Sequence, residues 1–305
     1  ALQRVGADTR WLASLGVPVA VGDVRDPPDA LARAVEGCTH VVHAAGLVYA
    51  GSSWSEIRSV NVGGTRNVLE AAALAGVAHA VHVSSVAVYG PPAKGVDDGT
   101  PLGDLPPPAH AYGRSKREAE TAAREVAAAR GLRLTVLRSA AVYGERDRLM
   151  APRIARLTRW PVAFTLGSGR NTIPTVYAGN VADAAWIALR AKGDAGTYDV
   201  GMDHPLTQRA LLEGIARGLG RTPRIVPVPA SLVRAGAAVL GALRVPTPGA
   251  PGLPLGRVVA LGLADNPYRS ERIRRELGWR PPHRHEDALV RTGAWLKEAA
   301  ERSAA

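Results

Sequence analysis

Short apolar runs alternate with longer amphipathic segments over the first half of the chain, and this alternation restricts the fold more than any other feature. The runs with the length and composition of buried strands lie at residues 17–21, 39–44, 79–84 and 132–138. Helical patterns separate them, near residues 28–37, 54–75 and 111–130. Strand and helix in repeated alternation are typical of parallel strands joined by crossover helices. The sequence therefore predicts an α/β fold with a parallel sheet.

The pattern is less regular beyond residue 144. Further helices are predicted near residues 153–158, 207–219, 231–243 and 269–277, and residues 198–201 are expected to return to the sheet. Residues 244–256 contain four prolines and three glycines, which predicts a loop, either a cover for a substrate or a plain connector. We expect one compact unit with a smaller second lobe, because 305 residues with 46% hydrophobic content can bury a sizeable core.

Composition narrows the classes of partner and compartment. The net charge of +11 raises the question of a polyanionic partner, but the arginines are scattered without interleaved aromatic residues, so we expect no nucleic-acid partner. Cys38 is the single cysteine, which predicts a reducing compartment, by default the cytoplasm, and its place before an apolar run predicts a core position. No apolar run approaches the length of a membrane span, and no metal site is predicted.

The run 112–116 contains a tyrosine and a lysine four residues apart. Four residues make about one helical turn, so Tyr112 and Lys116 are expected on one face of a helix. An ammonium beside a phenol favours the phenolate, which would bring the tyrosine pKa from about 10 toward neutrality. Such a pair can exchange a proton with a carbonyl or an alcohol. Taken alone, the same spacing also fits an accidental pair on a solvated helix.

Hydroxyl-bearing and small residues follow two of the predicted strands. Ser84 and Ser85 end the apolar run at residues 80–83, and residues 44–46 (AAG) end the run before it. The carboxyl ends of parallel strands line the crevice where open α/β sheets bind ligands. Asn61 lies on the intervening predicted helix, which could direct it toward the same crevice.

These segments, in this order, resemble the extended short-chain dehydrogenase/reductase family, also called the NAD-dependent epimerase/dehydratase family. They are residues 22–26 (GDVRD), 43–46 (HAAG), the helix of Asn61, the serine pair 84–85, the pair Tyr112 and Lys116, and residues 137–144 (LRSAAVYG), 167–169 (GSG), 180–184 (NVADA) and 275–281 (RELGWRP). The resemblance covers nearly all of the chain.

The resemblance implies a Rossmann-like doubly wound parallel sheet with a smaller α/β substrate lobe. It assigns residues 1–160 and 174–201 to an NAD(P)-binding domain, and residues 161–173 and 202–305 to the substrate lobe. The family's opening strand, glycine-rich turn and helix, which hold the cofactor pyrophosphate, do not precede Ala1. Loss of a central strand would leave unpaired backbone on two neighbours, so we expect an incomplete gene or sequence rather than a naturally short enzyme.

The resemblance also assigns roles to individual residues. Tyr112 would move the proton to or from the substrate oxygen, Ser85 would hydrogen-bond that oxygen, and Lys116 would lower the tyrosine pKa and hold the nicotinamide ribose. The residues assigned to the cofactor are Arg4, Asp23, Val24, Ala44, Ala45, Gly46, Asn61, Ser84, Tyr112, Lys116, Ser139 and Ala140.

Three of these assignments have a plainer alternative. Asn61, in the interior of a helix, could instead serve only to hydrogen-bond the local backbone, and Asp23 could be a turn residue. Arg4 lies where an arginine pairs with a 2′-phosphate, which favours NADP(H) over NAD(H), but it could also be a surface arginine in a loop.

The predicted substrate is an apolar ketone or alcohol. Nucleotide-sugar enzymes of the family usually have asparagine where this chain has Ala141, and a diphosphate-binding arginine where it has Ile173. These changes make the chain more similar to the dihydroflavonol reductase and 3β-hydroxysteroid dehydrogenase branch, although Gly179 departs from that branch too. The leading hypothesis is an NAD(P)-dependent ketone/alcohol oxidoreductase. The alternatives are a nucleotide-sugar epimerase or dehydratase and a noncatalytic NAD(P)-sensing protein. Many relatives dimerise through the two helices predicted at residues 54–75 and 111–130, so a homodimer is a further expectation.

Overall fold

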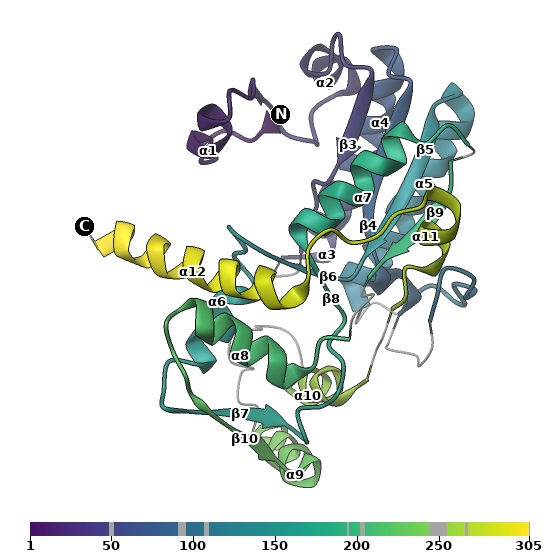
Figure 1. The fold of residues 1–305 in the computed structure, drawn as a ribbon. Coiled ribbons are helices and arrows are strands. Elements are labelled where there is room, and N and C mark those ends of the chain that lie inside the picture. Colours follow the sequence, from purple (N-terminus) through teal and green to yellow (C-terminus); the bar gives the residue numbers. More distant parts are fainter. Residues whose placement is uncertain are drawn as a thin grey trace. The chain divides into compact units, whose positions relative to one another are not determined.

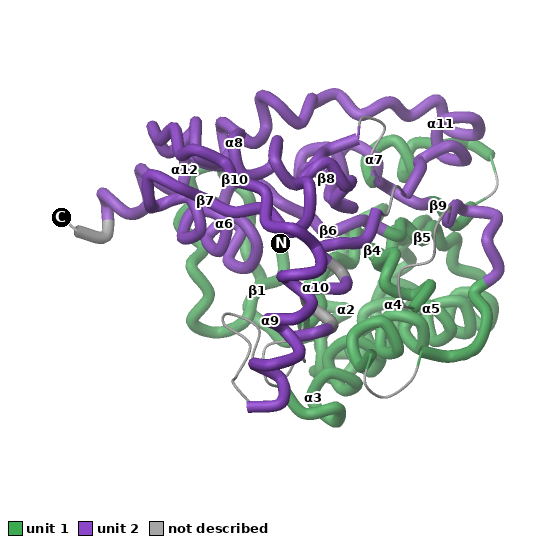
Figure 2. The backbone as a smooth tube through the Cα atoms, turned by 90° about the horizontal axis from the view of Figure 1, so that it is seen from below, with its two compact units in different colours: residues 1–90, 102–138, 185–198 green, residues 91–101, 139–184, 199–305 purple. Residues whose placement is uncertain are grey.

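The computed structural model forms two compact units, which Figure 2 distinguishes by colour. The first comprises Ala1–Gly90, Leu102–Arg138 and Ala185–Tyr198, and the second comprises Pro91–Pro101, Ser139–Ala184 and Asp199–Ala305. The structure describes residues 1–48, 52–90, 96–106, 110–193, 195–201, 205–243, 255–265 and 268–304.

The strands of the first unit are parallel, which confirms the predicted α/β class. The strands β1 (Leu2–Gln3) and β2 (Ala20–Val21) form one parallel pair. A four-stranded sheet has the order β3 (His40–His43), β4 (His79–Ser85), β5 (Arg133–Ser139) and β9 (Thr197–Val200), and the last residues of β5 and β9 belong to the second unit. Strands β4 and β5 are mostly buried on both faces, which explains their nearly continuous apolar runs, whereas β3 has alternate exposed residues.

The helices of the first unit follow the predicted pattern with one interruption. They are α1 (Arg10–Ser14), α2 (Pro28–Ala34), α3 (Trp54–Arg58), α4 (Gly64–Leu74) and α5 (Ala111–Arg130), with the 3₁₀ turn η2 (Val86–Tyr89) after β4. The predicted helix 54–75 is broken by a π-helical turn, η1 (Ser59–Gly63), which contains Asn61. Helix α5 has the predicted bounds, because Gly131 ends it in the left-handed conformation (φ 65°).

The apolar core of the first unit lies between the sheet and α4 and α5, which lie side by side in Figure 1. Its buried residues are Leu69, Ala72, Val77, Ala80, Ala123, Val126 and Leu132. The cluster fixes helix α5 against strand β4, the two elements that carry Tyr112 and Ser85. The predicted core position of Cys38 is wrong: its side chain is exposed, because the residue lies in the turn before β3.

The second unit contains two further parallel strand pairs and most of the remaining helices. The pairs are β6 (Ala141–Tyr143) with β8 (Thr175–Tyr177), and β7 (Val162–Leu166) with β10 (Arg224–Val228). The helices are α6 (Ala151–Leu157), α8 (Gln208–Gly218), α9 (Ala230–Ala242), α10 (Leu255–Leu263), α11 (Glu271–Leu277) and α12 (His285–Ala304), while α7 (Ala178–Arg190) spans both units.

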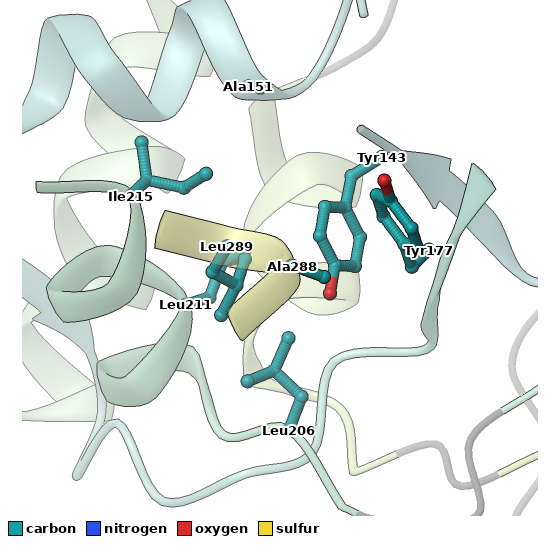
Figure 3. Close-up of a cluster of buried hydrophobic side chains, with 8 residues drawn as sticks. All are labelled: Tyr143, Ala151, Tyr177, Leu206, Leu211, Ile215, Ala288 and Leu289. Atoms are coloured by element: carbon teal, nitrogen blue, oxygen red, sulfur yellow. The ribbon is translucent and has the colours of Figure 1, made fainter. Parts of the chain in front are cut away.

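The core of the second unit surrounds the ring of Tyr143, which is 1% exposed. Figure 3 shows this ring next to that of Tyr177, with aliphatic side chains from α8 and α12 around them. The ring centroids are 5.8 Å apart at an angle of 52°. The hydroxyl of Tyr143 forms a 2.8 Å hydrogen bond with the His285 ring, so its polar atom is not left unpaired in the core.

Two other expectations concern this part of the chain. Most of the predicted loop 244–256, residues 244–254, lies outside the described residues, and α10 begins at Leu255. In the described part of the chain, no helix has both the length and the apolar character needed to span a bilayer. The assignment of cofactor and substrate functions to separate ranges stays a prediction.

Candidate active site

Tyr112 and Ser85 meet in the first unit, as the sequence predicted. Tyr112 lies in the first turn of α5, and Ser85 is the last residue of β4. Ser85 lies near enough to Tyr112 for its hydroxyl to lower the pKa of the phenol through a side-chain hydrogen bond. The Ser85 hydroxyl also accepts a 3.2 Å hydrogen bond from the backbone N–H of Ala87, which fixes its direction at the start of η2. A phenol and a hydroxyl are thus held at the carboxyl end of a parallel strand, where a substrate oxygen can meet both.

The electrostatics of the pair differ from the expectation. Burial raises the pKa of Tyr112, and the hydrogen bond from Ser85 lowers it by less. Burial also lowers the pKa of Lys116 to about 8, while the charge of Glu120 acts in the opposite direction. The lysine, only 5% exposed, donates a 3.0 Å hydrogen bond to the carbonyl of Val83. The structure therefore does not show the predicted acidic phenol, because desolvation of Tyr112 outweighs the effect of Ser85.

Asn61 ties the segment after β3 to helix α5. Its Oδ1 accepts from the backbone N–H of Leu47 at 2.6 Å, and its Nδ2 donates to the Leu47 carbonyl and to Ser115 Oγ at 3.1 and 2.9 Å. The π-helical turn places this side chain toward α5, and π-bulges frequently occur at functional sites. A Cβ added to Gly46 would lie 3.2 Å from Lys116 Nζ and 3.5 Å from Asn61 Oδ1, so these three residues converge.

A pocket of about 680 Å³ opens beside this cluster in the first unit. Its lining includes residues that directly follow β1, β2 and β3, together with residues of these strands and of the neighbouring helices. Six residues predicted to bind the cofactor line it: Arg4, Asp23, Val24, Ala44, Ala45 and Gly46. The structure therefore brings together, from three separate strands, residues that the sequence singled out one by one.

The charged groups at the rim of the pocket are partly paired. Arg25 donates two hydrogen bonds to the Asp23 carboxylate, at 2.9 and 2.8 Å, and this contact lowers the pKa of Asp23 to about 2. The exposed side chain of Arg4 adds a smaller effect in the same direction. The backbone N–H of Asp23 donates to Asp26 Oδ2 at 2.7 Å, so Asp23 is also a turn residue.

The remaining predicted residues lie elsewhere. Ser84 is 2% exposed and donates to Glu120 Oε1 at 2.7 Å, so its hydroxyl is used inside the protein and it does not line the pocket. Ser139 and Ala140 belong to the second unit, and their assignment to the cofactor stays a prediction. The sequence did not predict Ser115 as the partner of Asn61, although it lies beside Lys116 in the run 112–116. In the described ranges, no group of three or more histidine, cysteine or acidic side chains could hold a metal ion.

Gly113 allows helix α5 to approach η2 closely. A Cβ at this position would lie 2.4 Å from the carbonyl oxygen of Ala87, well inside van der Waals contact. We expect Gly113→Ala to lower the free energy of unfolding by about 1–3 kcal/mol, because backbone must move to remove the overlap. Gly63→Ala is the matched control, since nothing lies within 4 Å of its added methyl. The control should be neutral or stabilising by up to about 1 kcal/mol. Urea denaturation measures both, and equal stability of the two variants would contradict the close approach.

Comparison with known proteins places the chain among NAD-dependent enzymes. Residues 3–201 match the model of the NAD dependent epimerase/dehydratase family. The chain is 28% identical to a 4-hydroxy-2-methyl-3-oxo-4-farnesyl-3,4-dihydroquinoline-1-oxide ketoreductase of Stigmatella aurantiaca, over 95% of this chain and 86% of the relative. It is 35% identical to an N-acetyl-alpha-D-glucosaminyl-diphospho-ditrans,octacis-undecaprenol 4-epimerase of Escherichia coli O157:H7, over 59% of this chain and 53% of the relative.

The fold is similar to that of a dTDP-glucose 4,6-dehydratase from Streptomyces venezuelae, solved with NAD bound. The TM-score is 0.70 at 24% identity, and the match covers 97% of this chain and 85% of the dehydratase. At this identity the likeness shows the Rossmann-like fold, as predicted. The chain spans only about half to two thirds of the length of several curated relatives.

Proposed function

The chain belongs to the NAD dependent epimerase/dehydratase family, and we propose that it acts as an NAD(P)-dependent oxidoreductase on a ketone or an alcohol. The observation that carries the proposal is the approach of Ser85 to Tyr112, with Lys116 one turn after Tyr112 on the same helix. The family also contains epimerases, and one fold can carry several functions or none. The proposal therefore rests on the site and not on the fold.

The residues of the first unit suit a dinucleotide. The pocket is large enough for part of such a ligand, and small residues at positions 44–46 let it approach the backbone. A bound nicotinamide would supply the hydride donor or acceptor. Lys116 would hold ribose hydroxyls with the ammonium protons that do not bond to Val83, and Asn61 would keep the backbone of Leu47 in place.

Tyr112 and Ser85 would handle the proton at the substrate oxygen. In the reductive direction, the phenol donates its proton to that oxygen while Ser85 donates a hydrogen bond to it. The raised pKa of Tyr112 keeps the phenol protonated at neutral pH, which is the form that reduction of a ketone needs. The positive charge of Lys116 would stabilise the phenolate that remains after transfer.

The finer preference for NADP(H) rests on Arg4. Arg4 lines the pocket, where its guanidinium could pair with a 2′-phosphate, while Arg25 is already paired with Asp23. The apolar substrate class rests on the second unit. Ile173 packs against the hydrophobic cluster of Tyr143, and Ala141 has no polar group, so neither residue can neutralise a diphosphate.

The test is cofactor consumption by the full-length protein. We expect NADPH absorbance at 340 nm to fall when apolar ketones are added, with NADH used at least tenfold less efficiently if Arg4 selects the phosphate. No turnover across a panel of apolar carbonyls would overturn the proposal. Interconversion of nucleotide sugars without net cofactor consumption would favour the epimerase or dehydratase alternative, and cofactor binding without either reaction would favour a sensing protein.

Two further assignments stay proposals. A homodimer would form through the helical segment 54–75, which comprises α3, η1 and α4, and through α5; ion pairs such as Arg58 with Glu118 and Arg66 with Glu125 join these two segments within the chain. The cytoplasm remains the proposed location, since the chain contains one cysteine and no disulfide framework.

A further inference from the structure

A buried ionic network lies directly behind the proposed active site. Glu120 is 3% exposed and Arg138 is 5% exposed. The Arg138 guanidinium donates two hydrogen bonds to the Glu120 carboxylate, from Nε to Oε1 at 3.0 Å and from Nη2 to Oε2 at 2.9 Å. The same carboxylate accepts from Ser84 Oγ at 2.7 Å and from Arg124 Nη2 at 3.1 Å. A buried carboxylate with four hydrogen bonds is rigidly held.

The network joins every element that carries a proposed catalytic residue. Glu120 lies on α5, two turns after Tyr112 and one turn after Lys116, so the three side chains share a helix face. Ser84 is the neighbour of Ser85 on β4. Arg138 also donates a 2.9 Å hydrogen bond to the hydroxyl of Tyr89, the last residue of η2, and lies over its ring at 5.0 Å.

Glu120 is also the acidic group whose charge acts on Lys116. Burial lowers the pKa of Lys116, and Glu120 opposes that effect. Besides Tyr112 on the same helix face, Lys116 acts on the rings of His43 on β3 and His82 on β4. Burial lowers the pKa of both rings, so they are uncharged at neutral pH. The cations Arg124 and Arg138 both bond directly to the Glu120 carboxylate.

We propose that Glu120 is a positioning residue for the Tyr112 and Lys116 pair: anchored by Arg138, it fixes helix α5 against Ser85 and supplies the negative charge that keeps the lysine ammonium charged. The role rests on the proposed function, in which the ammonium stabilises a phenolate. An apolar side chain at position 120 could fix the helix equally well. The role that only a carboxylate can fill there is to supply the negative charge.

The chain allows a direct measurement on the lysine. It contains only four lysines, at positions 94, 116, 192 and 297, so protein labelled with [13Cε]lysine gives few NMR signals, and Lys116→Arg identifies the one of interest. We expect Glu120→Gln to lower the titration midpoint of the Lys116 signal by about one pH unit or more, which is a tenfold loss of proton affinity. The matched control is Glu118→Gln, on the same helix, where Glu118 pairs at the surface with Arg58 and Arg114. It should leave the midpoint unchanged.

Activity gives a second readout. In Glu120→Gln, kcat should fall about fivefold near pH 8, because the charged fraction of Lys116 falls by that factor, and should recover toward pH 6.5 with little change in KM. A merely structural loss would lower activity equally at all pH values. If Glu120→Gln does not fold because Arg138 is left unpaired, the double variant Glu120→Gln/Arg138→Gln removes both charges and should show the same displaced midpoint. An unchanged Lys116 midpoint in the folded variant would overturn the inference. A wild-type protein without turnover would refute the proposed function, while the lysine titration would still decide the role of Glu120.

Discussion

Tyr112→Phe is expected to lower kcat for carbonyl reduction by about 10²–10⁴, the usual contribution of a positioned general acid. The phenol hydroxyl is the group that meets Ser85 at the end of β4, and phenylalanine keeps the ring while removing the proton. The ring is partly buried in the first turn of α5, so the fold should be retained. Cofactor affinity should change by no more than about threefold, because the pocket residues after β1, β2 and β3 are untouched.

The measurement compares kcat, KM and cofactor affinity across three variants. Ser85→Ala should lose less than Tyr112→Phe, since it removes a hydrogen bond to the substrate oxygen but leaves the proton donor. Tyr198→Phe is the control, because it deletes the hydroxyl of another buried tyrosine, on β9. Full activity in Tyr112→Phe would eliminate the phenol as the proton donor. If Tyr112→Phe and Tyr198→Phe lose the same activity, the cause is a loss of protein stability and not the loss of a proton donor.

The meeting of Tyr112 and Ser85 could be predicted because it depends on short-range rules. A four-residue spacing sets a helix face, and the carboxyl end of a parallel strand sets an edge of the sheet. The same rules placed Asp23 and Gly46 after their strands, on the rim of one pocket. The helix α5 was predicted at its observed bounds because its pattern is long and ends at a glycine.

Other features depend on tertiary contacts that no local pattern contains. The bidentate pairing of Glu120 with Arg138 joins a helix to a later strand, and Ser84 was assigned to the cofactor because its buried partner could not be seen. The π-helical turn coincides with bonds from Asn61 to Leu47 and Ser115, which are distant in the sequence. The sign of the Tyr112 pKa shift was wrong for a similar reason, since desolvation depends on the packing around the ring.

Lowering the pH from 7.5 to 5.5 is expected to reduce the free energy of unfolding by about 4 kcal/mol through three buried histidines. His43 and His82 are cross-strand partners on β3 and β4 with stacked rings 5.3 Å apart, and His79 lies earlier on β4. Burial lowers the pKa of His43 to about 3 and of His79 to about 4, and lowers that of His82 well below its ordinary value. In the unfolded chain each ring would titrate near 6.5.

The sign follows from which state binds the proton. Above pH 6.5 the three rings are neutral in both states, so they add no pH dependence. As the pH falls below 6.5, the unfolded chain takes up protons that the folded protein cannot accept, and each ring costs about 1.4 kcal/mol of stability by pH 5.5. The loss is large against a total of about 5–15 kcal/mol for a typical domain. Urea denaturation at pH 7.5 and 5.5 measures it, provided that activity or fluorescence shows a single transition.

His82→Leu isolates one histidine of the three. Neither ring nitrogen of His82 has a hydrogen-bond partner among the described residues, so leucine removes two unsatisfied polar atoms from a fully buried site. Stability at pH 7.5 should therefore stay the same or rise, while the loss on going to pH 5.5 should shrink by about 1.4 kcal/mol, the share of one ring. His40→Gln is the control, since that ring is exposed on β3 and should leave the loss as it is. The contrary outcome is that His82→Leu and His40→Gln both lose as much free energy of unfolding as the wild type between the two pH values. The imidazole of His82 is then protonated inside the folded protein, and the neutral environment inferred around Lys116 is wrong.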